Sequence, residues 1–128
     1  MIHHIDLAVS NLERSREFYE RALAPLGLAP VITYTNYAGR QVVGFGALPD
    51  PAFWIRDGEP VRGRLHVAFH ANSRAAVDAF HAAAVHAGGT DNGAPGLRPR
   101  YADHWYAAFV LDPDGHNIEA VCRQSQGA

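Results

Sequence analysis

The chain has 128 residues, 48% of them hydrophobic, with a formal net charge of -2 and a single cysteine, Cys122. This composition fits one domain with a substantial core, and the lack of a basic excess excludes electrostatic binding of nucleic acid or anionic lipid as the main role. One cysteine cannot form an intrachain disulfide, and no charged leader or spanning apolar run stands out, so we expect a cytoplasmic protein without a membrane partner.

The first half of the chain predicts a strand, a helix and three more strands. Residues 2–9 alternate in polarity and place His4 opposite the bulky apolar side chains. Ser10 and the glutamate three positions later predict a capping box for a helix that ends at Gly27. Short β-branched or aromatic runs then predict strands over 31–35, 41–45 and 52–56.

The second half follows the same plan. Residues 65–71 alternate and place His66 opposite the bulky apolar side chains, and Asn72 or Ser73 caps a helix that ends at 88–89. Strands are expected near Thr90, over 106–111 and over 117–122.

The positions of proline and glycine predict where the second half has turns and loops. A turn at 112–115 joins the last two strands, and the Gly- and Pro-rich segment 93–101 predicts a loop beside a cleft. In the last strand Glu119 shares a face with Asn117 and Val121. His116, just after the turn, is expected at the surface.

The two halves repeat each other. A gapless shift of 62 positions lays His4 over His66, Phe18 over Phe80 and Gly27 over Gly89. A duplicated module folds into two similar halves around a pseudo-twofold axis. We therefore expect one domain over 1–123, made of module 1 (1–57) and module 2 (64–123), followed by a flexible tail over 124–128.

Three side chains form a candidate metal site: His4, His66 and Glu119 lie on predicted strands, and the histidines occupy matching points of the repeat. For one strand histidine, a partly buried residue with a hydrogen-bond partner is the better explanation. For the two matched histidines together with a glutamate, a metal site is the better explanation. Three such ligands leave coordination positions on the ion open for substrate oxygens. The same ligands suit iron, manganese, nickel or zinc, so the divalent ion is left open.

The arrangement resembles the vicinal oxygen chelate superfamily, which contains glyoxalase I, methylmalonyl-CoA epimerase, extradiol dioxygenases, fosfomycin-resistance enzymes and bleomycin-resistance proteins. The segments that carry the resemblance are Met1-Ile2-His3-His4-Ile5, Leu12-Glu13-Arg14-Ser15 with Phe18-Tyr19, His66-Val67-Ala68-Phe69, and Asp112-Pro113-Asp114-Gly115 through Ile118-Glu119. The resemblance implies an α+β fold with two tandem βαβββ modules that form a curved, partly closed mixed sheet. It implies His4, His66 and Glu119 as metal ligands, with Glu119 also as catalytic base.

One position departs from that pattern. Glyoxalase I and the epimerase take a further glutamate ligand from the last strand of the first module, where this sequence has Phe53-Trp54-Ile55. The gapless shift pairs Asp57 with Glu119, which leaves Asp57 as a substitute. The missing ligand argues against ordinary glyoxalase I chemistry. The remaining site of two histidines and one glutamate resembles the dioxygenase and fosfomycin-resistance branches more closely.

The resulting expectation is a divalent-metal-dependent enzyme of lyase, isomerase or dioxygenase type. It would chelate neighbouring oxygens of a small substrate and stabilise an enolate-like or alkoxide intermediate. Candidate pocket residues are aromatic or cationic: Tyr37, Trp54, Arg98, Arg100, Tyr101, His104 and Tyr106.

Two alternatives are a drug-sequestering protein of the bleomycin-resistance type and a member that keeps its metal for stability only. We expect a homodimer with two sites, in which modules pair within a chain or are exchanged between chains.

Overall fold

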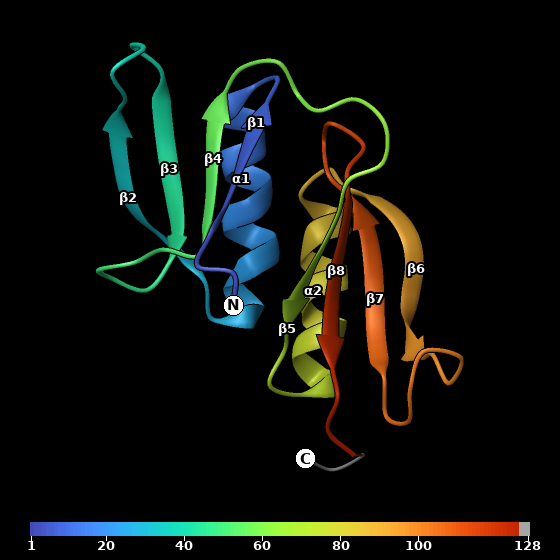
Figure 1. Ribbon diagram of the computed structural model, residues 1–128. Coiled ribbons are helices and arrows are strands. Elements are labelled where there is room, and N and C mark those ends of the chain that lie inside the picture. The colour runs from blue at the N-terminus through green and yellow to red at the C-terminus, as the bar shows by residue number, and fades with distance from the viewer. Residues whose placement is uncertain (126–128) are drawn as a thin grey trace.

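The computed structural model describes residues 1–125, which fold as two successive βαβββ modules. The elements of module 1 are β1 (Ile5–Val9), α1 (Leu12–Leu23), the short 3-10 helix η1 (Ala24–Leu26), β2 (Ala29–Thr35), β3 (Gln41–Gly46) and β4 (Phe53–Asp57). Those of module 2 are β5 (His66–His70), α2 (Arg74–His86), β6 (Thr90–Leu97), β7 (Tyr106–Leu111) and β8 (Asn117–Cys122). The α+β class and the paired modules are thus confirmed (Figure 1). Of the tail expected over 124–128, residues 126–128 lie outside the described part.

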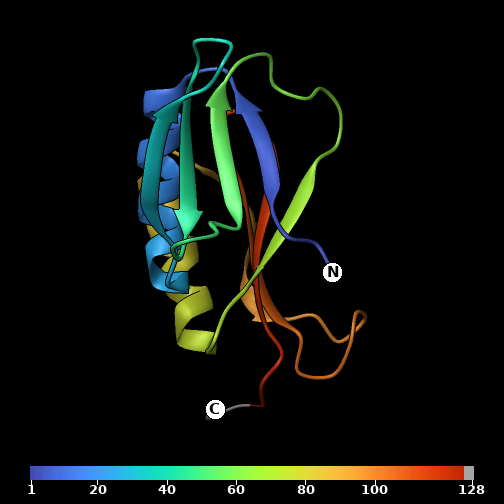
Figure 2. The same cartoon turned by 60° about the vertical axis from the view of Figure 1, so that its left-hand side comes forward.

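Each module forms its own mixed four-stranded sheet, in the orders β1-β4-β3-β2 and β5-β8-β7-β6. The pairs β1–β4 and β5–β8 are parallel, and the other neighbours are antiparallel. Over residues 1–125, no strand pairing joins the two sheets, so β1 and β5 are each an edge strand. The linker from β4 to β5 arches over one end of the molecule (Figure 2).

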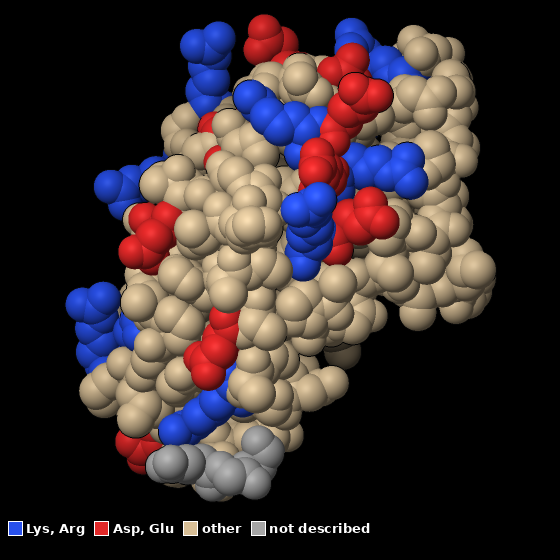
Figure 3. Space-filling view, turned by 180° about the vertical axis from the view of Figure 1, so that it is seen from behind, with Lys and Arg blue, Asp and Glu red and all other residues tan. Residues whose placement is uncertain are grey.

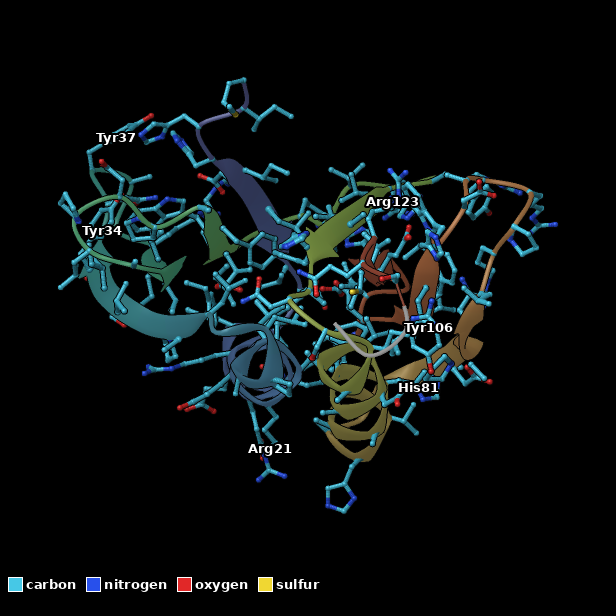
Figure 4. The ribbon with its side chains drawn as sticks, turned by 90° about the horizontal axis from the view of Figure 1, so that it is seen from below. Arg21, Tyr34, Tyr37, His81, Tyr106 and Arg123 are labelled. Atoms are coloured by element: carbon cyan, nitrogen blue, oxygen red, sulfur yellow. The ribbon has the colours of Figure 1, made fainter. Side chains whose placement is uncertain are left out.

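One apolar core serves both modules. It contains Phe18 from α1, Phe80 from α2 and the apolar faces of both sheets, and the rings of Phe53 and Phe69 meet across the modules at 5.3 Å. Because α1 and α2 pack together on the same side of both sheets (Figure 4), the opposite side of each sheet is left without a helix. We call that side the open face.

The modules approach closely at Gly89. A Cβ added there would lie 2.5 Å from Val110 Cγ1 and 2.6 Å from Phe18 Cε1, so only glycine fits. Gly88, just after the C-cap Ala87 of α2, takes a left-handed φ of 103° and turns the chain away from the helix. The tight contact between Phe18 and Gly89 helps to fix the relative position of the two modules.

The helix caps differ in how well the sequence predicts them. Ser73 caps α2 as expected, since its hydroxyl accepts a hydrogen bond from the Ala76 amide. For α1 the prediction of Ser10 is wrong: the cap is Asn11, which accepts from the Arg14 amide at 3.1 Å. Ser10 is instead engaged by Asp114 of module 2, to which both its amide and its hydroxyl donate.

A buried polar cluster ties the turn of module 2 to module 1. Tyr19 on α1 donates its hydroxyl hydrogen to Asp112, and burial, with the Asp112 carboxylate next in effect, raises the Tyr19 pKa well above its usual value. His116 is 2% exposed, and its Nε2 lies 3.0 Å from the carbonyl oxygen of Val61 in the linker. The expected surface position of His116 is therefore wrong, because the turn folds against α1 and the linker.

The loop expected over 93–101 is partly strand. β6 continues to Leu97, but its register with β7 shifts between Asp91 and Gly93 and again before Gly96. An edge strand tolerates such irregularities, which explains why Gly and Pro do not end it.

On the helix side of the molecule, arginines and carboxylates are interspersed and form no large patch of one sign (Figure 3). Neither α1 nor α2, the α-helices of residues 1–125, has the length and apolar character required to cross a membrane.

Candidate metal centre

The open face of module 2 brings distant residues together by strand register. Alternate residues of β5, β7 and β8 face away from the core, and Phe109 and Val121 form a small second apolar cluster there with Ala107 and Trp105. Glu119 on β8 pairs with Ala68 on β5, two residues after His66. The histidine and the glutamate are therefore diagonal neighbours on one face.

His66 and Glu119 are in direct contact. His66 Nε2 lies 2.8 Å from Glu119 Oε1; the His66 side chain is 50% exposed and that of Glu119 is 3% exposed. Two ligand atoms that bind one ion at roughly 2.0–2.2 Å and at right angles lie about 3 Å apart. The spacing and the donor types of this pair thus fit a shared divalent ion.

The second carboxylate oxygen of Glu119 is held by Trp105, which sequence reasoning missed. Trp105 Nε1 donates to Glu119 Oε2 at 3.1 Å, so both oxygens of the buried carboxylate have a partner. The Arg123 guanidinium lies over the indole at 5.1 Å, and the Tyr101 ring is T-shaped to it at 5.8 Å. Trp105 follows an irregular loop, where no strand alternation indicates the direction of a side chain.

His4 is not part of this contact. It is exposed, it precedes β1, and its Nδ1 lies 2.8 Å from His3 Nδ1. Within the described residues 1–125, no group of three or more His, Cys, Asp or Glu side chains is placed to hold one metal ion. A single chain therefore presents the three expected ligands in two parts.

Strand register identifies the counterpart of Glu119 in module 1. Trp54 on β4 pairs with Asp6, two residues after His4, as Glu119 pairs with Ala68, two residues after His66. The gapless shift fails here because module 2 has three more residues before its last strand. Asp57 lies three residues after Trp54 and so points to the opposite face of the sheet.

Two of the expected pocket residues have partners within the chain, Arg98 beside Phe109 on the open face and Tyr106 on the core side of β7. Arg98 donates to the carbonyl oxygens of Gly96 and Ala94 at 2.9 and 2.7 Å and stacks over the Phe109 ring at 5.3 Å. Tyr106 faces α2, where its hydroxyl donates to Asp78 at 2.6 Å, and this hydrogen bond raises the Tyr106 pKa.

The other expected pocket residues divide between the modules. Arg100 lies over the Tyr101 ring at 5.2 Å, and His104 is an exposed loop residue with a φ of 60°. Tyr37 is fully exposed beyond β2 and lines a cavity of about 550 Å³ in module 1. Figure 4 shows Tyr37 at the outer end of module 1 and Arg123 on the module 2 side, closer to the middle of the molecule.

The comparisons with known proteins agree on one family. The model of the Glyoxalase/Bleomycin resistance protein/Dioxygenase superfamily matches residues 1–120. A glyoxalase/bleomycin resistance protein from Albidiferax ferrireducens is 30% identical, with a TM-score of 0.77 over 94% of this chain and 97% of that one. No curated protein matches the chain.

Two further solved structures have known chemistry. A glyoxalase I mutant from Zea mays is 25% identical, with a TM-score of 0.70 over 94% of this chain and 46% of that one. The fosfomycin resistance protein FosX from Listeria monocytogenes, solved with Mn(II) and 1S,2S-dihydroxypropylphosphonic acid, is 17% identical, with a TM-score of 0.69 over 98% of this chain and 94% of that one. The likeness to FosX shows the fold alone.

Proposed function

We propose, because the chain belongs to the glyoxalase/bleomycin resistance protein/dioxygenase superfamily, that it is a divalent-metal-dependent enzyme acting on a small substrate with two neighbouring oxygens. The observation that carries the proposal is the contact of His66 Nε2 with Glu119 Oε1 at 2.8 Å on the open face of module 2. An imidazole nitrogen and a carboxylate oxygen at this spacing are suited to one iron, manganese, nickel or zinc ion.

Each residue of the pair has a distinct role in this proposal. His66 offers Nε2 from a half-exposed ring, and Glu119 offers Oε1 while Trp105 retains Oε2. Glu119 would thus bind through one oxygen and serve as the base for a substrate proton within hydrogen-bond reach. When bound, the ion would supply Lewis-acid polarisation of the substrate oxygens.

A second copy of the chain completes the site in this proposal by contributing its His4. The contact of Phe18 with Gly89 and the hydrogen bond from Tyr19 to Asp112 hold the modules in an arrangement that, over residues 1–125, does not group His4 with the His66–Glu119 pair. β1 and β5 are both edge strands with one unpaired side. A twofold-related copy that places its β1 beside β5 would create two equal sites in a homodimer.

The position of Trp54 favours a site with three protein ligands. A fourth carboxylate ligand at the point matching Glu119 would come from β4, where the indole stands instead. Chemistry with more open metal positions, as in addition or ring cleavage, therefore fits better than glyoxalase I chemistry.

Metal uptake by the dialysed protein tests the proposal. We expect one divalent ion per chain in an elemental assay after incubation with Mn(II), Fe(II), Ni(II) or Zn(II), and loss of stoichiometric uptake in His66→Ala and Glu119→Ala with the circular dichroism spectrum unchanged. His86→Ala, which removes an exposed imidazole on α2, is the matched control and should bind normally. Full occupancy in either site variant contradicts the proposal, and no uptake by the native protein favours the drug-sequestering alternative.

A further inference from the structure

We propose that the cavity beside His4 binds an aromatic group of the substrate, in contact with the Trp54 indole. This inference rests on the proposed function and adds the substrate class. His4 and Trp54 line the same cavity of about 290 Å³ on the open face of module 1. A cavity of roughly 150 Å³ is enough for benzene, so a single ring fits here.

Contacts on three sides hold the Trp54 indole. Its Nε1 donates to the carbonyl oxygen of Pro51 at 3.1 Å, and the Tyr34 ring meets it edge-on at 5.9 Å. Beneath it lies Gly44, where an added Cβ would come within 2.8 Å of Trp54 Cζ3. Because the only hydrogen-bond donor of the side chain is used within the chain, the part of the indole that lines the cavity offers a ligand aromatic, apolar surface.

The position of Trp54 sets what it would contact. Trp54 occupies the position in module 1 that Glu119 occupies in module 2. It pairs with Asp6, which lies two residues after His4. A substrate whose two oxygens are bound at the His4 end of the cavity would extend its body over the indole. Offset or edge-on contact between aromatic rings is favourable beyond the area buried, which selects a ring over an alkyl group.

The charges around the cavity are paired. Asp6 is bonded by Arg56 Nε at 3.1 Å, and Asp50 lies 3.8 Å from His3 Nε2. Each carboxylate therefore faces a basic group, and the indole, Tyr34 and Val42 supply the apolar surface between them. Because the four side chains of these pairs are 41–69% exposed, their attraction is weak, and the apolar surface is what favours a ring.

Two small chelators distinguish the contribution of an aromatic ring to binding from that of the two oxygens. Benzohydroxamate and acetohydroxamate both offer two neighbouring oxygens and differ only in phenyl against methyl. With the full-length protein loaded with the divalent ion it takes up, we expect benzohydroxamate to bind about tenfold more tightly by calorimetric titration. Trp54→Ala should abolish that preference, Trp54→Phe should retain most of it, and acetohydroxamate affinity should be equal in all three proteins.

The outcomes distinguish this inference from the proposed function. Equal binding of the two chelators to the native protein, or an equal loss of both in Trp54→Ala, overturns the aromatic subsite and leaves the metal site standing. A metal-loaded protein that binds neither chelator contradicts the proposed function and this inference with it. If Trp54→Ala fails to fold, the native preference and its retention in Trp54→Phe decide the question.

Discussion

The open faces of the two modules start from the same plan and differ in one decisive position. In module 2 the strand paired with the histidine strand carries Glu119, which contacts His66 at 2.8 Å and is buried. In module 1 the matching position carries Trp54, and His4 has only His3 as a neighbour at hydrogen-bond distance among the contacts of residues 1–125. At the two matching positions, both modules therefore carry an imidazole, and module 2 alone carries a carboxylate.

This difference assigns separate tasks to the two faces. A buried carboxylate needs partners, and His66 and Trp105 provide them in module 2. In module 1 the Trp54 ring packs directly against Gly44, where there is no room for a side chain. In the proposed site, module 2 would supply His66 and Glu119 to the ion, and module 1 would supply His4 and the surface for the body of the substrate.

The largest expected effect is on metal binding when Glu119 changes. Glu119→Gln keeps the shape but removes the charge that an ion requires, so the metal affinity should fall by more than about 100-fold, beyond the loss caused by removing a supporting hydrogen bond. Competition against a chromophoric chelator measures it. An affinity within tenfold of the native value would remove Glu119 from the ligand set.

The two tryptophans should respond differently to the same change. Trp105→Phe removes the N–H that holds Glu119 Oε2 and should weaken metal binding by about 10- to 100-fold. Trp54→Phe is the matched control and should leave metal affinity within about twofold, because its N–H bonds only Pro51. Equal effects of the two substitutions on the measured affinity would break the distinction between the faces.

The cluster that joins the modules should respond to pH. Tyr19→Phe leaves Asp112 without its hydroxyl donor and should reduce the free energy of unfolding by about 1–3 kcal/mol in urea titrations at pH 7. Because the Tyr19 pKa is raised on folding, its contribution is complete below the unfolded pKa of about 10 and is lost as pH rises through the folded value. Native stability should thus fall more steeply above pH 10 than that of Tyr19→Phe, and parallel curves would contradict this assignment.

The smallest expected effect concerns Asp57. Asp57→Asn should leave metal affinity within about twofold, because strand alternation turns this side chain from the open face. The same titration as for Glu119→Gln tests it. A loss comparable to that of Glu119→Gln would restore Asp57 as a ligand.

Strand alternation and the repeat predicted much of this architecture. They indicated two βαβββ modules, a cap for α2 at Asn72 or Ser73, of which the structure has Ser73, and the face on which Glu119 lies. The family resemblance drawn from them is confirmed. These features depend on residues close in sequence or on a fixed period, which explains the success.

Contacts between distant segments were beyond such reasoning. Ser10 was assigned to the wrong partner because Asp114 approaches it only in the folded chain, and His116 is buried by the linker. Trp105 lies in an irregular segment, and the match of Trp54 with Glu119 required the register of β4. The metal ligand set stays a prediction, since among residues 1–125 of one chain the expected ligands in contact are His66 and Glu119.

A mixed dimer of two variants tests most directly whether two chains share each site. Chains carrying His4→Ala and Glu119→Ala are given different tags, refolded together and purified as the mixed dimer. Exchange between chains predicts one bound ion per mixed dimer, because one of its sites keeps both native contributions, while neither variant alone binds a full complement. No ion in the mixed dimer, with normal uptake by the native dimer treated in the same way, would contradict the shared site.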